Sequence, residues 1–271
     1  MTPSKKQRLD VLMVDRQLAP TRAKAQALIM AGEVTIPGVA HLKPGMLVDS
    51  GAAIVLRSPL PYVGRGGLKL AHALNAFNLD PSGCIALDVG ACTGGFSDVL
   101  LQHGAARVYA IDVGYGQLDW RIRQDARVVV LERTNIRYLE ILPPEPNHAP
   151  VLADCGVVDV SFISLSLVLP AMQRLLKPAN WIVALIKPQF EAGADHVGKG
   201  GIVRDPRVHR MVVERIVGTA AAIGLTTVGL ARSPITGAEG NIEFLAHFVP
   251  AIAQPDPVSL PAALIELGIA P

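Results

Sequence analysis

One glycine-rich segment restricts the possible folds of this chain more than any other feature. The segment ALDVGACTGGFSDVLL (86–101) predicts a buried strand over 85–89, a glycine-rich turn and an amphipathic helix that begins near Gly95. Glycines in such a turn let the backbone approach a ligand closely and adopt dihedral angles that other residues avoid. Asp112 follows Asp88 by 24 residues and ends the next predicted strand, where a carboxylate can accept hydrogen bonds from both hydroxyls of a ribose. This order predicts a nucleotide-type cofactor site beside a parallel sheet.

The spacing of the glycines distinguishes two classes of cofactor. A dinucleotide-binding fold would show G-x-G-x-x-G, with a helix N-terminus facing a pyrophosphate. The glycines here are Gly90, Gly94 and Gly95, and Asp88 precedes them. A carboxylate at that place would repel a pyrophosphate but suits the cationic amino-acid end of S-adenosylmethionine. The pattern therefore favours a methyl-donor site, and the alternative is a structural glycine turn in another doubly wound protein.

From Gly66 onward the chain alternates between strand-like and helix-like segments. This alternation is typical of a parallel sheet covered by helices on both faces. The expected strands are 85–89, 107–111, 128–131, 157–160 and 181–186, followed by an antiparallel, hairpin-like end at 226–233 and 242–249. The expected helices are 68–77, 96–102, 163–176 and 207–223, with a short one at 261–267. The predicted fold class is therefore α/β, with a Rossmann-like sheet.

The first 56 residues predict a separate, small α+β module. Two helices are expected, one from Leu9 to Arg16 and one from an N-cap at Thr21 to Met30, and short strands follow at 33–36, 47–48 and 53–56. Residues 1–65 hold nine Lys and Arg against four Asp and Glu, a net +5, whereas the other 206 residues hold 16 against 19, a net −3. A basic module ahead of a near-neutral body suggests that the module binds a polyanion. The alternative is a solvated surface whose charges happen to fall this way.

These patterns divide the chain into four parts. We expect a small basic domain at 1–57, a linker rich in proline and glycine at 58–65, an α/β domain at 66–250 and a proline-rich tail at 251–271.

The basic module resembles the S4 RNA-binding domain. The resemblance rests on RLDVLMVDRQLAPTRAKAQALIMAGEVTI (8–36), the KPG turn and the closing strand. In the S4 family, two helices carry basic residues toward RNA phosphates and grooves and recognise shape more than sequence. The resemblance implies that RNA binds one face of the module, formed by Arg8, Arg22, Lys24 and Gln26. The alternative is that these are ordinary surface charges on a helical hairpin.

Four charged residues of the larger domain stand in apolar or strand-end contexts. Lys69 lies in RGGLKLAHAL, Asp159 ends the fourth strand in GVVDVSFISL, Lys187 ends the fifth in IVALIKPQFE, and Glu243 interrupts a strand in GNIEFLAHF. Open α/β sheets bind ligands outside the carboxyl ends of their strands, which favours Asp159 and Lys187 as site residues. Each residue taken alone is more often a cap or a surface charge, so the prediction rests on the set.

The order Lys–Asp–Lys–Glu resembles the tetrad of the FtsJ-like ribose 2′-O-methyltransferases. With an S4 module in front, the chain resembles the TlyA (haemolysin A-type) rRNA methyltransferase family, on the segments YVGRGGLKL, LDVGACTGGF, DVSFISL, ALIKPQFE and GNIEF, which span 62–244. The resemblance implies a class I methyltransferase fold, S-adenosylmethionine as cofactor, and ribosomal RNA or ribosomal subunits as partner. The expected target is a cytidine ribose of the large subunit, with the small subunit as a second candidate. The implied cofactor contacts are Asp88, Gly90, Ala91, Thr93, Gly94, Gly95, Phe96 and Asp112.

Methyl transfer to a ribose hydroxyl requires alignment and a better oxygen nucleophile, because the donor is already activated. A lysine can supply a neutral amine as base, which burial favours, or a cation that stabilises the oxyanion. Nearby carboxylates would orient such lysines by charge-assisted hydrogen bonds. By the resemblance, Lys187 acts on the hydroxyl, while Lys69, Asp159 and Glu243 hold Lys187 and the substrate ribose.

Two points stay open in the sequence. The segment ADCGVVDVSF departs from the pattern of an acid followed directly by a strand, so Asp154 rivals Asp159 as the tetrad acid; we prefer Asp159 because it lies in the better-matched motif. The glycine-rich loop 193–205 is either a mobile lid that touches RNA through Lys199 and Arg204, or a plain connection.

Other classes of protein fit the sequence less well. The three cysteines lack metal-ligand spacing, so we expect reduced thiols and no metal. No apolar run approaches the ~18 residues that span a bilayer, and no apolar segment follows the basic start, so we expect a cytoplasmic protein without membrane contact. A cytolysin, a non-catalytic S4 adaptor on ribosomes and an S4-bearing pseudouridine synthase are the alternatives. The first would need a spanning or cationic amphipathic helix, the second would not need an intact site, and the third would not need the glycine-rich turn.

Overall fold

The computed structural model describes residues 6–30, 34–39, 41–56, 61–144, 151–237 and 240–269. The chain splits into two compact units between Pro61 and Tyr62, and each unit is described by itself. The four residues 57–60 lie outside the described residues, so the first part of the expected linker does as well.

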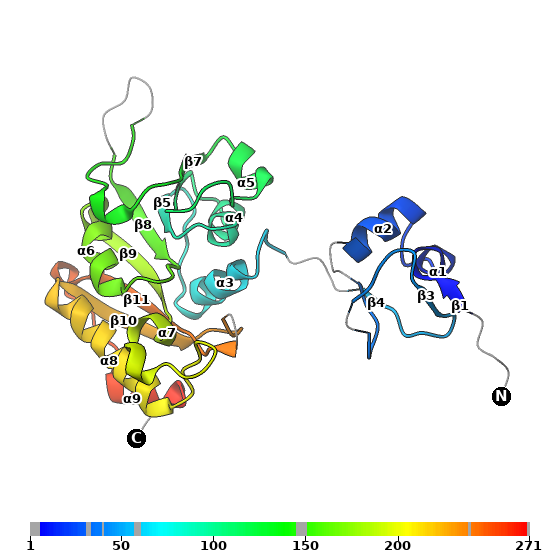
Figure 1. Cartoon of the computed structure of the whole chain (residues 1–271). Coiled ribbons are helices and arrows are strands. Elements are labelled where there is room, and N and C mark those ends of the chain that lie inside the picture. The colour runs from blue at the N-terminus through cyan, green and yellow to red at the C-terminus, as the bar shows by residue number, and fades with distance from the viewer. Residues whose placement is uncertain are drawn as a thin grey trace. The chain divides into compact units, whose positions relative to one another are not determined.

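The smaller unit consists of two helices and two short antiparallel sheets (Figure 1). Its elements are β1 (Lys6–Arg8), α1 (Leu9–Asp15), α2 (Arg22–Met30), β2 (Val34–Thr35), β3 (Leu47–Asp49) and β4 (Val55–Leu56). Strand β1 pairs with β3, and β2 pairs with β4. The apolar faces of both helices pack on the strands to form one core, which includes Leu9, Met13 and Ile29.

Both predicted helices of the smaller unit are present, and the first strand is an addition. Lys24 donates its backbone N–H to Thr21 Oγ1 at 3.2 Å, as expected for an N-cap threonine. Strand β1 was not expected, because a three-residue polar strand leaves no hydrophobic pattern and is defined by its pairing with β3. Glu33, the expected start of the next strand, lies outside the described residues.

The larger unit contains a seven-stranded sheet in the order β10-β11-β9-β8-β5-β6-β7. The strands are β5 (Ile85–Val89), β6 (Arg107–Ile111), β7 (Val128–Leu131), β8 (Ala153–Val158), β9 (Leu176–Ile186), β10 (Leu225–Arg232) and β11 (Phe244–Pro250). Strands β5 to β9 are parallel, whereas β11 runs antiparallel between β9 and β10. The predicted parallel sheet with an antiparallel end is therefore confirmed.

Helices cover both faces of this sheet (Figure 1). They are α3 (Gly66–Ala76), α4 (Gly95–Gln102), α5 (Trp120–Gln124), α6 (Leu165–Gln173), α7 (Pro188–Glu191), α8 (Pro206–Ala222) and α9 (Leu260–Glu266). Side chains alternate across each strand, so Leu87 faces the core under α6 and α8, whereas Ala86 faces the core under α3 and α4. Asp88 therefore points to the α4 side, directly below the glycine-rich turn.

Several expected boundaries in the larger unit are wrong. Strand β8 begins at Ala153 rather than at 157, and α6 ends at Gln173, because Leu176 already pairs with Ala153 as the first residue of β9. An apolar run alone does not separate the end of a buried helix from the start of a buried strand. Glu243 precedes β11 and does not interrupt it.

The two segments that were expected to flank the larger domain belong to it. Val63 donates its backbone N–H to Asp98 on α4 at 2.8 Å, so the second half of the expected linker is attached to this unit. In the expected tail, Leu264 on α9 and Leu267 join the core beneath α8. In the part of the chain that the structure describes, no helix is long and apolar enough to cross a membrane.

Candidate active site

The glycine-rich turn lies at the carboxyl end of β5 and has backbone angles that only glycine adopts easily. Gly90 has φ +85° and Gly94, the residue before α4, has φ +92°. A Cβ atom on Gly90 would lie 2.4 Å from the Asp159 carbonyl oxygen, so the turn passes directly against the end of β8. The predicted need for glycine is explained by one close backbone approach, at Gly90, and by the left-handed angles of Gly90 and Gly94.

A cavity of about 290 Å³ opens beside this turn. Its walls come from the start of α3, the glycine-rich turn, the end of β8 and the segment before β11. Among its lining residues are Lys69, Gly90, Ala91, Thr93, Phe96 and Asp159. The cavity thus joins two of the four expected catalytic residues to the expected cofactor loop.

A smaller hollow adjoins the turn on its other side, at the carboxyl ends of β6 and β7. Asp112 lines it, and its two carboxylate oxygens accept backbone N–H groups from Cys92 at 2.8 Å and Gly114 at 2.6 Å. Each oxygen keeps a further lone pair that can accept a ribose hydroxyl. Gln117 and Glu132 line the same hollow, and sequence reasoning did not find them. The position of Glu132, directly after β7, was the signal that could have done so.

Asp88 does not reach either hollow, which corrects the expected direct contact with a cationic ligand group. Its side chain is fully buried, and Ser97 donates its hydroxyl to Oδ2 at 2.6 Å. Oδ1 is buried and has no hydrogen-bond partner within the described residues. Burial raises the pKa of Asp88 to about 7, which outweighs the hydrogen bond from Ser97. Asp88 therefore supports the turn from below.

The first of two lysine–carboxylate pairs joins Lys69 on α3 to Glu243 before β11. The two charged atoms are 2.6 Å apart, and both side chains are nearly buried. Gly237 packs on this pair, since a Cβ atom there would lie 2.1 Å from Glu243 Oε1. The residues are 174 positions apart in sequence, so only the tertiary fold brings them together.

The second pair joins Lys187, directly after β9, to Asp159, directly after β8. Lys187 Nζ lies 2.5 Å from Asp159 Oδ1 and donates a hydrogen bond to Ser161 Oγ at 3.0 Å. Adjacent parallel strands end at the same edge of the sheet, which explains why these two side chains meet. Asp159 and Lys69 line one cavity, so the two pairs lie at the same site.

The rival acid Asp154 occupies a different part of the sheet. It lies at the start of β8, where Lys177 contacts it at 2.6 Å and the backbone N–H of Ile85 donates to it at 2.9 Å. These contacts are at the amino ends of the strands, opposite the cavity. The geometry therefore groups Asp159, and not Asp154, with Lys187.

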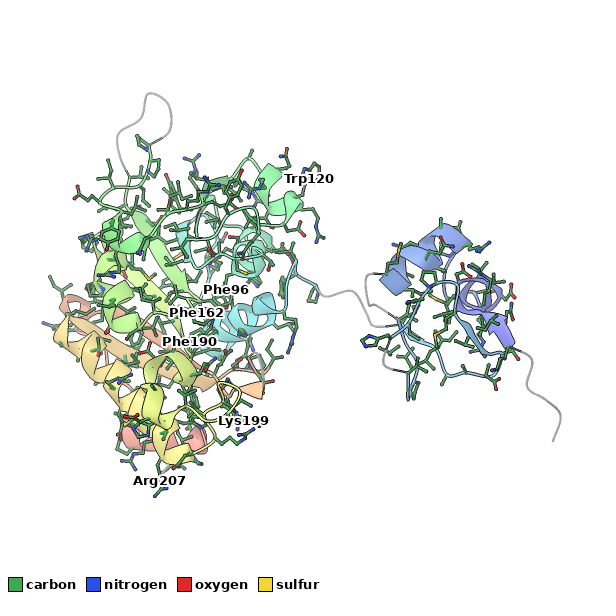
Figure 2. The ribbon with its side chains drawn as sticks, viewed as in Figure 1. Phe96, Trp120, Phe162, Phe190, Lys199 and Arg207 are labelled. Atoms are coloured by element: carbon green, nitrogen blue, oxygen red, sulfur yellow. The ribbon has the colours of Figure 1, made fainter. Side chains whose placement is uncertain are left out.

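Phe162, three residues after Asp159, is 90% exposed and has a φ of +63°. Its ring packs against Phe190 at a centroid distance of 4.8 Å, as Figure 2 also shows. A bulky residue in the left-handed region is strained by roughly 1–2 kcal/mol. An exposed, strained aromatic ring beside a charged site indicates a contact surface, and the sequence analysis missed it.

The glycine-rich loop 193–205 is attached to the site by one buried amide. Asn241 accepts the backbone N–H of Val203 at 3.0 Å and donates to the carbonyl of Gly201 at 2.9 Å. Asn241 also lies two residues before Glu243. The loop is therefore anchored at its C-terminal half, whereas Lys199 is exposed near its tip (Figure 2).

In the smaller unit, three of the four residues expected to contact RNA converge on one buried acid. Arg8, Arg22 and Gln26 donate to the carboxylate of Asp10 at 2.8 to 3.1 Å. The Arg8 guanidinium and its neighbours hold the pKa of Asp10 well below its usual range. These three side chains therefore have a structural role in the unit, whereas Lys24 is exposed on α2. The sequence spacing of Arg22 and Gln26 on one helix face was correct, but their shared partner was missed.

The larger unit thus has the fold of a class I methyltransferase, with a glycine-rich turn and two lysine–carboxylate pairs at one edge of its sheet. Within the described residues, no group of His, Cys, Asp and Glu could hold a metal ion. A family model of FtsJ-like methyltransferases matches residues 62–249, and one of S4 domains matches residues 7–54.

Relatives of known sequence and structure match nearly the whole chain. YqxC of Bacillus subtilis (strain 168) is 51% identical over 90% of this chain and 86% of its own length. The 16S/23S rRNA (cytidine-2′-O)-methyltransferase TlyA of Mycobacterium tuberculosis (strain ATCC 25618 / H37Rv) is 45% identical over 89% of each chain. A solved structure from Streptococcus thermophilus, described as a hemolysin, superposes with a TM-score of 0.74 at 43% identity, over 97% of this chain and 94% of its own. The chain belongs to the TlyA (haemolysin A-type) family of FtsJ-like methyltransferases with an S4 domain.

Proposed function

We propose that this protein transfers a methyl group from S-adenosylmethionine to the 2′-hydroxyl of a cytidine in ribosomal RNA. The observation that carries the proposal is the presence of two lysine–carboxylate contacts, Lys187–Asp159 and Lys69–Glu243, beside one glycine-lined cavity. The M. tuberculosis relative, whose name states this activity for 16S and 23S rRNA, supports the choice of nucleotide. A cytoplasmic location is part of the same proposal, because ribosomal RNA would be the substrate.

The residues around the glycine-rich turn fit S-adenosylmethionine. Asp112 would hold the ribose hydroxyls of the cofactor with its remaining lone pairs, and the backbone at Gly90, Ala91 and Thr93 would line the methionine end. Gly94 and Gly95 let α4 start close to this backbone, and Phe96 forms part of the cavity wall. Asp88 supports the turn indirectly, because its carboxyl group accepts a hydrogen bond from Ser97 at the start of α4. When bound, the cofactor supplies an electrophilic methyl group on a sulfonium.

Lys187 has the geometry to act on the ribose hydroxyl. After the ammonium group of Lys187 has passed one proton to Asp159, at 2.5 Å, the neutral Nζ atom accepts the proton of the 2′-hydroxyl as the oxygen bonds to the methyl group. The side chain is only 11% exposed, so bulk water competes little for the amine. Holding the oxygen in line with the methyl group is the larger task, because proximity and orientation can contribute roughly 7–11 kcal/mol to such a step.

The Lys69–Glu243 pair serves to orient the ribose. Lys69 lines the cavity, and its ammonium group can donate to a ribose oxygen while Glu243 holds it from the buried side. Phe162 has an exposed ring on which the base of the target nucleotide can stack after this base has flipped out of the RNA helix. The smaller unit binds the RNA through basic side chains such as Lys24, which is exposed.

The test is mass mapping of ribosomal RNA after incubation with the protein and S-adenosylmethionine. The wild-type protein should add one 2′-O-methyl group per target cytidine. Lys187→Ala should abolish the mark and leave the affinity for S-adenosylmethionine, measured by calorimetry, within about twofold, since Lys187 does not line the cofactor hollow.

The Lys177–Asp154 pair, at the amino ends of the strands, provides a matched control. Lys177 contacts Asp154 at 2.6 Å at the opposite edge, so Lys177→Ala removes the same kind of contact away from the cavity and should keep full methylation. Retained methylation in Lys187→Ala would remove this lysine from the mechanism. No binding of S-adenosylmethionine at millimolar concentration would reject the methyltransferase function and favour a ribosomal adaptor.

A further inference from the structure

Two segments of the larger unit meet along a line that begins at the Lys187–Asp159 pair. One is the loop after β8, and the other is Lys187 with the short helix α7. Lys187 contacts Asp159 and Ser161, and one turn further along α7 the ring of Phe190 packs on Phe162 at 4.8 Å (Figure 2). Residues that come later in one segment contact residues that come later in the other, so the two segments lie side by side in one defined register.

Glu191 makes the last contacts between the two segments, at the end away from Lys187. Its side chain is 2% exposed; Oε1 accepts the backbone N–H of Leu165 at 2.7 Å, and Oε2 accepts the hydroxyl of Ser164 at 2.7 Å. Arg215 on α8 lies 3.4 Å from Oε2. A buried carboxylate with three such partners is a stiff connection, because removing any partner leaves a desolvated charge.

The loop after β8 needs such a connection. Phe162 has φ +63° and is almost fully exposed, and a strained, exposed aromatic residue persists only where its surroundings determine its conformation. Ser164 and Leu165, which Glu191 holds, lie two and three residues after Phe162, where α6 begins. Glu191 therefore holds the C-terminal end of the loop on the same helix that carries Phe190.

We propose that Glu191 is a positioning residue for methyl transfer. It keeps α7 in register with the loop after β8, so that Lys187 Nζ stays on Asp159 and Phe162 stays exposed toward the substrate nucleotide. Glu191 is not among the lining residues of the cavity and acts only through these neighbours. The assignment rests on the proposed function to the extent that Lys187 is the group that acts on the ribose.

The first test measures the position of Lys187 without any substrate. Trace acylation of amines, mapped by mass spectrometry, reports how readily each lysine opens. In Glu191→Ala, acylation of Lys187 should accelerate by at least about threefold, because local opening governs the reactivity of a buried group. Lys69 is an internal control, since it is 10% exposed and belongs to the other pair. Equal acceleration at both lysines, or none at either, would overturn the proposal.

The second test measures methyl transfer in the same variants. Glu191→Ala should lower kcat roughly tenfold, because displacement of a reacting group by a fraction of an ångström has effects of this size, with the affinity for S-adenosylmethionine unchanged. Glu191→Gln keeps the side-chain shape and an acceptor for Leu165, and should recover most of the rate. Glu214→Ala, at an ion pair with Arg210 on α8, should behave as wild type.

These outcomes separate the two proposals. A wild-type kcat in Glu191→Ala would overturn the positioning role while leaving the proposed function intact. If wild-type protein methylates no RNA, the proposed function fails, and the acylation pattern still decides whether Glu191 positions Lys187. Should Glu191→Ala fail to fold, Ser164→Ala removes the hydrogen bond to Oε2 together with the N-cap bond to Ser166, and should accelerate acylation of Lys187 in the same direction.

Discussion

The buried carboxyl group of Asp88 should make the larger unit less stable as the pH rises through neutrality. Its folded pKa is about 7, against an ordinary value near 4 in an unfolded chain, because burial disfavours the ionised form. Between these two values the folded state holds a proton that the unfolded state has lost. The stabilisation is therefore fully present below about pH 4 and disappears as the pH rises through 7.

The size of this effect follows from the two pKa values. Proton linkage gives a loss of about 3 kcal/mol in the free energy of unfolding between pH 5 and pH 8. Asp88→Asn removes the titration but keeps an oxygen that can accept the hydroxyl of Ser97, which lies 2.6 Å away. The excess stability of the variant over wild type should therefore grow by about 3 kcal/mol between pH 5 and pH 8.

Urea unfolding at pH 5, 6, 7 and 8 measures this difference. Both tryptophans of the chain, Trp120 and Trp181, belong to the larger unit, so their fluorescence reports its unfolding. Asp256→Asn, at an exposed position, is the matched control and should show the wild-type pH dependence. Parallel curves for wild type and Asp88→Asn would show that Asp88 does not carry a shifted proton, and the reasoning from burial would be refuted.

Three further predictions follow from single contacts. Gly237→Ala should displace the Glu243 side chain from Lys69 and lower the rate of methyl transfer by about 100-fold. The control Gly218→Ala adds a methyl group in open space on α8 and should leave the rate unchanged. Equal rates in the two variants would contradict the close packing at Gly237. Asp10→Asn should destabilise the smaller unit by about 3 kcal/mol, as seen by hydrogen exchange of peptides from 6–56. In wild type the same stabilisation should be present above pH 4 and lost as the pH falls, because the pKa of Asp10 is lowered. Lys24→Ala should weaken RNA binding and reduce its salt slope by about 0.7–0.9, and an unchanged slope would exclude a phosphate contact.

Local patterns in the sequence predicted most elements of both units. Alternating strands and helices predicted the parallel sheet, and the glycine spacing predicted the turn at the carboxyl end of β5 with its two left-handed glycines. The elements that were missed are short. Helix α7 spans only four residues, Pro188–Glu191, and so carries too little periodicity to be recognised.

Side-chain partners were less accessible from the sequence. Arg22 and Gln26 were placed on one helix face correctly, yet their common partner Asp10 comes from another helix. Asp88 was expected to face a ligand, but the alternation of side chains along β5 turns it toward α4 instead. Periodicity determines the face of an element on which a residue lies, and packing determines what that face meets.

The sequence by itself determined the class of fold and the glycine-rich turn, because these depend on spacing along the chain, and the family resemblance proposed the four charged residues. Only the tertiary structure decided how the four residues pair. Lys69 meets Glu243 across 174 positions, and Lys187 meets Asp159 because β8 and β9 are neighbouring parallel strands that end at one edge. Strand order is a property of the whole sheet, so no local pattern contains it. It pairs Asp159, which its motif already favoured, with Lys187, and leaves Asp154 with Lys177.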